Sequence, residues 1–141
     1  MDVDRISFGN KNQPFYELSP LYRSDFVLLN RSWNSLMHFW VVNSLEDIDT
    51  QIELRKIKSL SKLIRAAGRY GVIDFSRIDK TLLLESIYEA FSQDKERGMV
   101  LLSTGSSELI YNAPKSFLTD GNRYGKLLMR MRYILAEDGS I

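Results

Sequence analysis

The chain has 141 residues, of which 44% are hydrophobic and 26% are charged, values typical of a soluble globular protein. This length suits one hydrophobic core, so residues 1–141 are predicted to form a single domain. The absence of cysteine excludes disulfides, thiolate nucleophiles and cysteine-based metal sites. No apolar run approaches the ~20 residues that cross a bilayer, and the N-terminus has no secretory-signal pattern. We therefore expect a cytoplasmic protein, of a cell or of an infected host, without a membrane partner.

The charge balance points away from one class of partner. The chain carries 19 basic and 18 acidic residues, a net charge of +1, so nucleic acid is not indicated. Basic residues nevertheless gather in two stretches, 55–69 and 126–132. A solvated helix face explains such stretches. The alternative is a phosphate-binding rim, which requires a pocket beside it.

Short strands and loops are predicted for residues 1–30, which are rich in aromatic residues, Gly, Asn and Pro, with the best strand at 26–30. Helical spacing begins after this region. Ser35 is predicted to cap the first helix and Gly68 to end the third. The first three helices are expected over about 35–45, 47–57 and 59–67.

In the second half, Ser76 and Asp79 resemble a capping box before a helix whose apolar positions continue to Phe91. Further helices are predicted over about 94–103 and 123–136, with a short strand at 108–112 between them. The apolar stripes of these helices are expected to form the core. The predicted fold class is therefore α+β, a mainly helical single domain with a few short strands.

Motifs that identify a chemistry on their own are missing. The only histidine, His38, leaves no His-pair metal site, and its apolar neighbours favour a packed, hydrogen-bonded structural role. The sequence contains neither a dinucleotide-binding GxGxxG nor a phosphate-loop GxxxxGK[ST]. Its carboxylates show no spacing that identifies an acid–base pair. We therefore predict no metal and no cofactor.

Several segments, taken in chain order, resemble the NADAR superfamily, the YbiA-like proteins. They cover nearly the whole chain: ISF at 6–8, PFYELSP at 14–20, SWNSLMHFW at 32–40, AAGR at 66–69, IDFSRIDKTLLLESIYEAF at 73–91, LLSTGSSELIY at 101–111 and GNRYGKLLMRMR at 121–132. The resemblance implies a mainly helical domain with a pocket for a phosphorylated ribose. Characterised members of that family cleave N-glycosidic bonds, in a riboflavin-pathway intermediate or in ADP-ribosylated guanine. Such a reaction needs a carboxylate and a positioned water near the ribose.

Two Glu positions of the family pattern are lost in this sequence, while an Asp/Asn position is kept as Asp74. The family's catalytic Glu, in a Glu-His pair, falls on Met37, and a thioether cannot transfer a proton or stabilise a cation as a carboxylate does. A second family Glu falls on Tyr111. The family's Trp-Gly pair is not visible in residues 112–120. These losses favour a domain that no longer performs the family reaction.

Other positions of the pattern are kept, and the resemblance implies that they bind the ligand. They are His38 of the Glu-His pair, Arg69 of a Gly-Arg segment, Phe75 at an aromatic position, and Asn122 and Gly125 of a closing Gly-x-Asn-x-x-Gly pattern whose first Gly is replaced.

Three functions follow from this partial match. The first is a catalytically degenerate NADAR-like domain that binds an ADP-ribose-like or phosphoribosyl ligand, or a protein partner. The second is a working N-glycosidase with a relocated carboxylate, for which Glu17 and Asp74 are the candidate catalytic acids. The third is a structural or assembly subunit, such as a homo-oligomer, that uses the fold as a scaffold.

Overall fold

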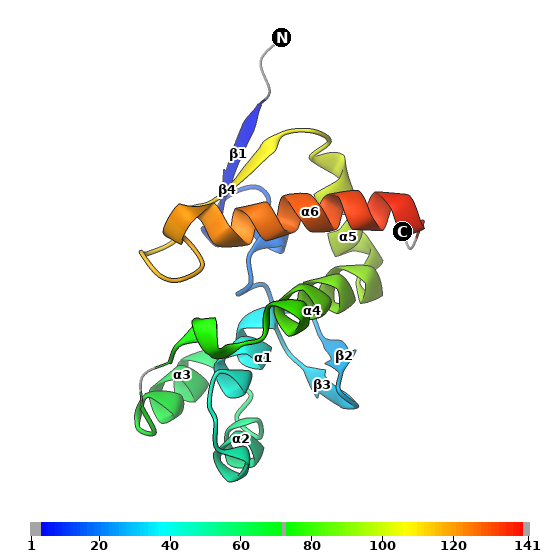
Figure 1. The fold of residues 1–141 in the computed structure, drawn as a ribbon. Coiled ribbons are helices and arrows are strands. Elements are labelled where there is room, and N and C mark those ends of the chain that lie inside the picture. Colours follow the sequence, from blue (N-terminus) through cyan, green and yellow to red (C-terminus); the bar gives the residue numbers. More distant parts are fainter. Residues whose placement is uncertain (1–3, 72, 140–141) are drawn as a thin grey trace.

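The computed structural model describes residues 4–71 and 73–139, and it confirms the mainly helical α+β fold (Figure 1). None of the helices in these two ranges is long and apolar enough to span a membrane. The strands and helices are β1 Arg5–Phe8, β2 Phe26–Leu28, β3 Arg31–Trp33, α1 Leu36–Asn43, α2 Ile48–Leu54, α3 Leu60–Gly68, α4 Lys80–Gln93, α5 Lys95–Ser103, β4 Glu108–Tyr111 and α6 Arg123–Asp138. Short 3-10 helices occur at η1 Tyr16–Leu18, η2 Phe75–Arg77 and η3 Asp120–Asn122.

Four helices begin with a side-chain cap, of which the cap at Ser35 was predicted. In four helices, the side chain of the N-cap residue accepts a hydrogen bond from the backbone N–H three residues on, which satisfies one of the free donors of the first turn. The pairs are Ser35 with His38 in α1, Asp47 with Thr50 in α2, Ser59 with Lys62 in α3, and Asp94 with Arg97 in α5.

The end of α3 lies at Gly68 as predicted, but Gly68 is the last helical residue and the cap is Arg69, in right-handed helical conformation. The predicted start of α4 is wrong. The capping box does not form, because Ser76 lies inside η2 and α4 begins after Asp79, whose side chain makes no capping bond. Instead, the carboxylate of Asp74 accepts the N–H of Ser76, two residues on, and this local bond favours a tight turn before the helix.

The strands form two small sheets of two strands each. The sequence pattern did not predict the bounds of β1 or β3. β1 pairs in parallel with β4, with Arg5 opposite Glu108 and Phe8 opposite Tyr111, across about a hundred residues of chain. The predicted strand at 26–30 reverses in its second half, because Leu29 and Asn30 both have positive φ, as in a type I′ hairpin turn. β2 and β3 are the two arms of this hairpin.

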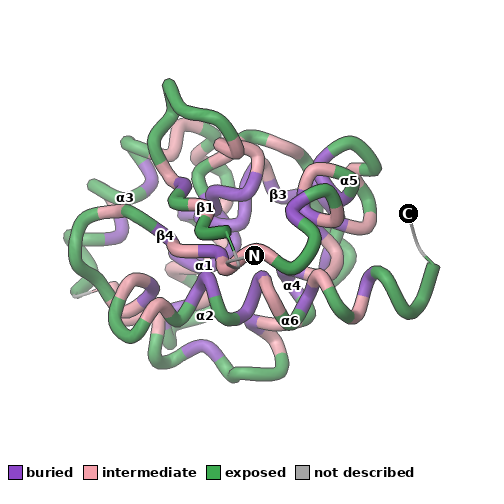
Figure 2. The backbone as a smooth tube through the Cα atoms, turned by 90° about the horizontal axis from the view of Figure 1, so that it is seen from above, coloured by how far each residue is buried: buried purple, intermediate pink, exposed green. Residues whose placement is uncertain are grey.

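Helix α1 lies at the centre of the core. Buried residues concentrate around α1 and β4 in the view from above (Figure 2). The indole N–H of Trp40, on α1, donates to the Ser86 hydroxyl of α4 at 2.9 Å, and its ring meets the Tyr124 ring of α6 edge-on with centroids 5.6 Å apart. One buried side chain thus joins α1, α4 and α6.

Candidate ligand-binding site

An apolar cavity of 280 Å³ lies where α1, η2 and the loop after β4 meet. Its wall brings together three positions that the resemblance singles out: Met37, Phe75 and Tyr111. The other residues of the wall are nearly all apolar: Leu21, Val41, Ile64, Ile73, Ala113, Pro114, Ser116 and Leu118. We call this space the apolar cavity.

Aromatic contacts hold the two rings of the wall in place. Phe75 packs edge-on against Trp40, with ring centroids 6.3 Å apart, and Tyr111 packs edge-on against Tyr124 at 5.1 Å. Trp40 and Tyr124 are themselves fully buried and in contact with each other. The two wall rings are therefore extensions of the core, and the cavity is preformed.

The described part of this wall contains no Asp or Glu. Met37 is buried, with 9% of its surface exposed, and its thioether has no proton to give. Burial, with Tyr16 nearby, raises the pKa of the Tyr111 hydroxyl to about 12, so this group stays protonated at neutral pH. The wall can therefore pack around an uncharged group, but it holds no carboxylate to act as the general acid–base that glycosidic cleavage requires.

Asp74 lies in the sequence between Ile73 and Phe75, two residues of the apolar cavity wall. Its carboxylate caps the short helix η2. The same Oδ1 atom accepts the N–H of Ser76 at 3.0 Å and the Ser76 hydroxyl at 2.6 Å. These hydrogen bonds lower the pKa of Asp74. A carboxylate stabilised in its ionised form suits a turn better than proton donation, and its catalytic role stays a prediction.

Glu17, the other candidate acid, lies in η1 and lines a different and more open cavity of 560 Å³, together with Tyr16 and Tyr22. The structure does not place it in the wall that contains Met37 and Tyr111. Its half-buried position at a cavity leaves its proposed role untested.

His38 makes a bond with each ring nitrogen. Nδ1 lies 2.6 Å from the Ser35 hydroxyl and Nε2 lies 2.9 Å from the Lys58 carbonyl oxygen. Because a carbonyl only accepts, Nε2 carries the proton and Nδ1 accepts from Ser35. Burial lowers the pKa of His38, which favours this neutral form. The ring ties the start of α1 to the chain before α3, as its apolar neighbours predict, and it is not part of the apolar cavity wall.

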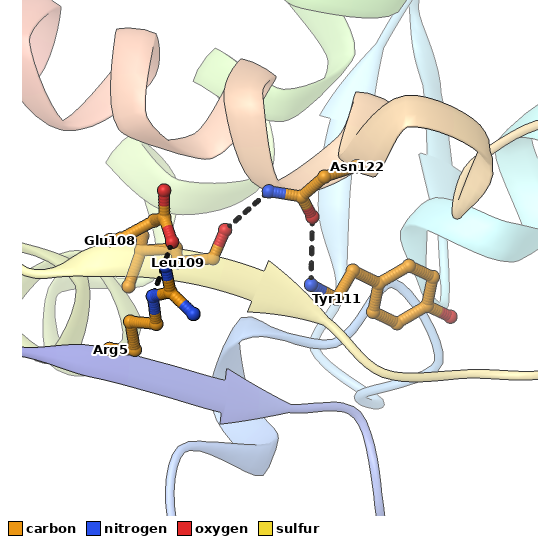
Figure 3. A network of polar contacts seen from close by, with 5 residues as sticks. All are labelled: Arg5, Glu108, Leu109, Tyr111 and Asn122. Atoms are coloured by element: carbon orange, nitrogen blue, oxygen red, sulfur yellow. Dashed lines mark hydrogen bonds and ion pairs between the residues drawn. The ribbon is translucent and has the colours of Figure 1, made fainter.

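The side chain of Asn122 holds the start of α6 against β4 (Figure 3). Asn122 Oδ1 accepts the N–H of Tyr111 at 3.0 Å, and its Nδ2 donates to the Leu109 carbonyl at 2.8 Å. A Cβ on Gly125 would lie 2.3 Å from that same carbonyl oxygen, so only glycine permits this approach. Neither residue lines the apolar cavity, and Arg69 is exposed at the end of α3.

Sequence reasoning missed most of the cavity wall. Leu21, Ile64 and Ala113 come from three separate segments, and hydrophobicity was their only signal. It also missed Arg97, whose buried guanidinium donates from Nε to the Glu17 carbonyl at 2.6 Å and from Nη2 to the Ser19 carbonyl at 2.8 Å. No group of three or more His, Asp or Glu side chains among the described residues is placed to hold a metal ion.

Comparison with known proteins identifies the fold. No protein-family model matches the sequence, and no curated protein sequence matches it. The NMR structure of the E. coli protein YbiA, however, superposes on this chain with a TM-score of 0.85 over 99% of this chain and 89% of that one, at 19% sequence identity. The chain therefore has a YbiA-like fold, as the resemblance implied.

Proposed function

We propose that this chain is a NADAR-like domain that has lost the glycosidase reaction and acts by binding. One observation carries the proposal. The two positions where the resemblance expects carboxylates, Met37 and Tyr111, lie in the wall of one preformed cavity, and neither is an acid. Loss of a carboxylate that acts as general acid or base typically costs ~10²–10⁴ in rate.

The resemblance supplies the class of ligand, and the cavity wall restricts how such a ligand binds. An ADP-ribose-like or phosphoribosyl molecule carries phosphates, but no Lys or Arg belongs to the described wall. Burial of an unpaired phosphate among apolar side chains is strongly unfavourable. The part that enters the cavity is therefore a sugar face or an uncharged ring beside Phe75 and Tyr111, with the phosphates outside.

A thermal-shift titration with ADP-ribose, NAD and ribose 5-phosphate tests the binding function. A ligand present at ~100 times its dissociation constant stabilises the folded state by about 2.7 kcal/mol, a shift of several degrees. We expect Ala113→Trp, which fills the cavity from its wall, to abolish the shift given by ribose 5-phosphate and to reduce the shifts given by ADP-ribose and NAD. Lys115→Trp adds the same ring at an exposed site two residues away and should preserve all three shifts.

The loss of activity is tested by incubating the same protein with an ADP-ribosylated guanine nucleoside and with a riboflavin-pathway N-glycoside, and by measuring released base. We expect no release above the uncatalysed rate. Release that disappears in Glu17→Gln or Asp74→Asn would establish the relocated-carboxylate glycosidase instead. A wild-type protein that shows neither release nor any ligand shift would direct the search to protein partners and to the scaffold function.

A further inference from the structure

A second site lies outside the apolar cavity, between the start of α4 and the start of α6. Two cavities of 370 Å³ and 390 Å³ meet there and share Lys80, Arg123 and Leu127 in their walls. The two cavities adjoin at these shared residues, and we describe them together as one groove with two halves. None of these residues belongs to the apolar cavity. We call it the α4–α6 groove.

One half of the α4–α6 groove is cationic. Arg123, Lys126 and Arg130 follow helical spacing on α6, which places them on one face, and Lys80 faces the same cavity from α4. All four are exposed, and among the described residues Asp120 is the only carboxylate in the wall of this half.

These four cations are not neutralised within the protein. In the described ranges the ion pairs are Arg5–Glu108 and Lys56–Glu53, both elsewhere on the surface. The whole chain carries a net charge of only +1, so this half of the groove is a strong local excess of positive charge. Such an excess attracts a ligand with several negative charges.

The other half has a mixed wall and supplies the apolar surface of the groove, so we call it the apolar half. Its apolar residues are Ile78, Leu83, Leu127 and Phe117, and its polar or charged residues are Ser76, Arg77, Asp79, Lys80 and Arg123. The Arg123 guanidinium lies 4.1 Å from the Phe117 ring centroid, and its Nε donates to the Phe117 carbonyl at 3.2 Å. This cation–π pair lies at the boundary between the two halves, because Arg123 belongs to both walls.

We propose that the α4–α6 groove binds a nucleoside di- or triphosphate, a function beyond the binding proposed for the apolar cavity. The base lies against the apolar half, beside the Phe117–Arg123 pair, and the phosphates accept charge-assisted hydrogen bonds from Lys80, Lys126 and Arg130. Each half has a volume in the range of small-molecule sites. The apolar side chains of the groove suit the base of a nucleotide, and its cationic side chains suit the phosphates.

Isothermal titration of the full chain with ADP, with pyrophosphate and with adenosine tests this proposal. We expect ADP to bind more tightly than either fragment, because only ADP occupies both halves. The double variant Lys126→Gln, Arg130→Gln should weaken ADP binding by about a hundredfold, since each of the two charge-assisted hydrogen bonds contributes about tenfold. The matched double variant Lys62→Gln, Arg65→Gln removes the same charges from the exposed face of α3 and should bind ADP as the wild type does.

Four results would overturn the proposal: no ADP binding to the wild type, equal weakening in both double variants, pyrophosphate binding as tight as that of ADP, or loss of ADP binding in Ala113→Trp. Equal weakening would show diffuse attraction by surface charge. Equal affinity of pyrophosphate would show that the apolar half holds no base. Loss in Ala113→Trp would place ADP in the apolar cavity.

Discussion

The side chain of Asn122 takes the place of a third strand beside Tyr111, with its Oδ1 atom 3.0 Å from the backbone N–H of that residue. Its Nδ2 completes the pair by donating to the Leu109 carbonyl. Gln93 acts in the same way on β2, where it bonds both the N–H and the C=O of Val27 at 2.8 Å. In each small sheet, a side-chain amide thus satisfies backbone groups that an open edge would expose.

Asn122→Ala should lower the free energy of unfolding by about 3 kcal/mol, measured by urea denaturation. The substitution leaves the N–H of Tyr111 and the carbonyl of Leu109 without their partner, at about 1–3 kcal/mol for a buried group. It also places alanine at φ 54, a left-handed conformation that asparagine tolerates better.

The control is Asn112→Ala, at an exposed asparagine one residue after β4. We expect a change below about 0.5 kcal/mol there. Similar losses in both variants would show that the Asn122 amide does not hold α6 on β4.

Two glycine-to-alanine substitutions should change the free energy of unfolding in opposite directions. Gly125→Ala should destabilise by about 1–3 kcal/mol or more, because the new Cβ meets the Leu109 carbonyl oxygen and both amide atoms of Asn122 within 2.6 Å. This outweighs the gain of about 1 kcal/mol in helix propensity. At Gly68, the end of α3, nothing lies within 4 Å of the new Cβ, so Gly68→Ala should stabilise by up to about 1 kcal/mol. Thermal denaturation of both variants measures the difference, and a stabilising Gly125→Ala would contradict it.

Arg97→Lys should destabilise the fold by about 3 kcal/mol, although it keeps the charge. The Arg97 guanidinium lies 4.2 Å from the Phe91 ring centroid and holds the Glu17 and Ser19 carbonyls with two different nitrogens. A lysine ammonium is a single point that cannot reproduce this fork and would remain a poorly paired buried charge.

Arg130→Lys, at an exposed position of α6, is the matched control and should change the free energy of unfolding by less than about 0.5 kcal/mol. If urea denaturation showed the two lysine variants to be equally stable, the two hydrogen bonds from Arg97 to the Glu17 and Ser19 carbonyls would not contribute to the free energy of unfolding.

Stability should fall as the pH drops below about 6.5 because of His38. Burial lowers the pKa of this histidine in the folded state from its ordinary value of 6.5. As the pH falls through 6.5, the unfolded chain takes up a proton that the folded protein resists, so the free energy of unfolding decreases. In His38→Gln this contribution is removed.

The measurement compares the free energy of unfolding of the wild type and of His38→Gln at pH 8 and at pH 5.5. The advantage of the wild type should be smaller at pH 5.5. An advantage that stays the same at both values would mean that His38 is not held neutral by its burial.

The sequence by itself determined where the helices lie and where most of them begin, α4 being the exception. Ser35, Asp47, Ser59 and Asp94 act on N–H groups only three residues away, and apolar spacing repeats within one turn, so local chemistry is sufficient. The resemblance to the NADAR superfamily also singled out Met37 and Tyr111, the two positions where that pattern has Glu and this sequence does not.

Only the tertiary structure decided what the motif residues do. The pairing of β1 with β4 joins segments about a hundred residues apart, which no local pattern encodes. The same holds for the roles of Asn122, Gly125 and His38, whose partners lie 11 to 20 residues away or on another element. The apolar cavity and the α4–α6 groove exist because distant side chains pack against one another, and packing is settled by the whole chain at once.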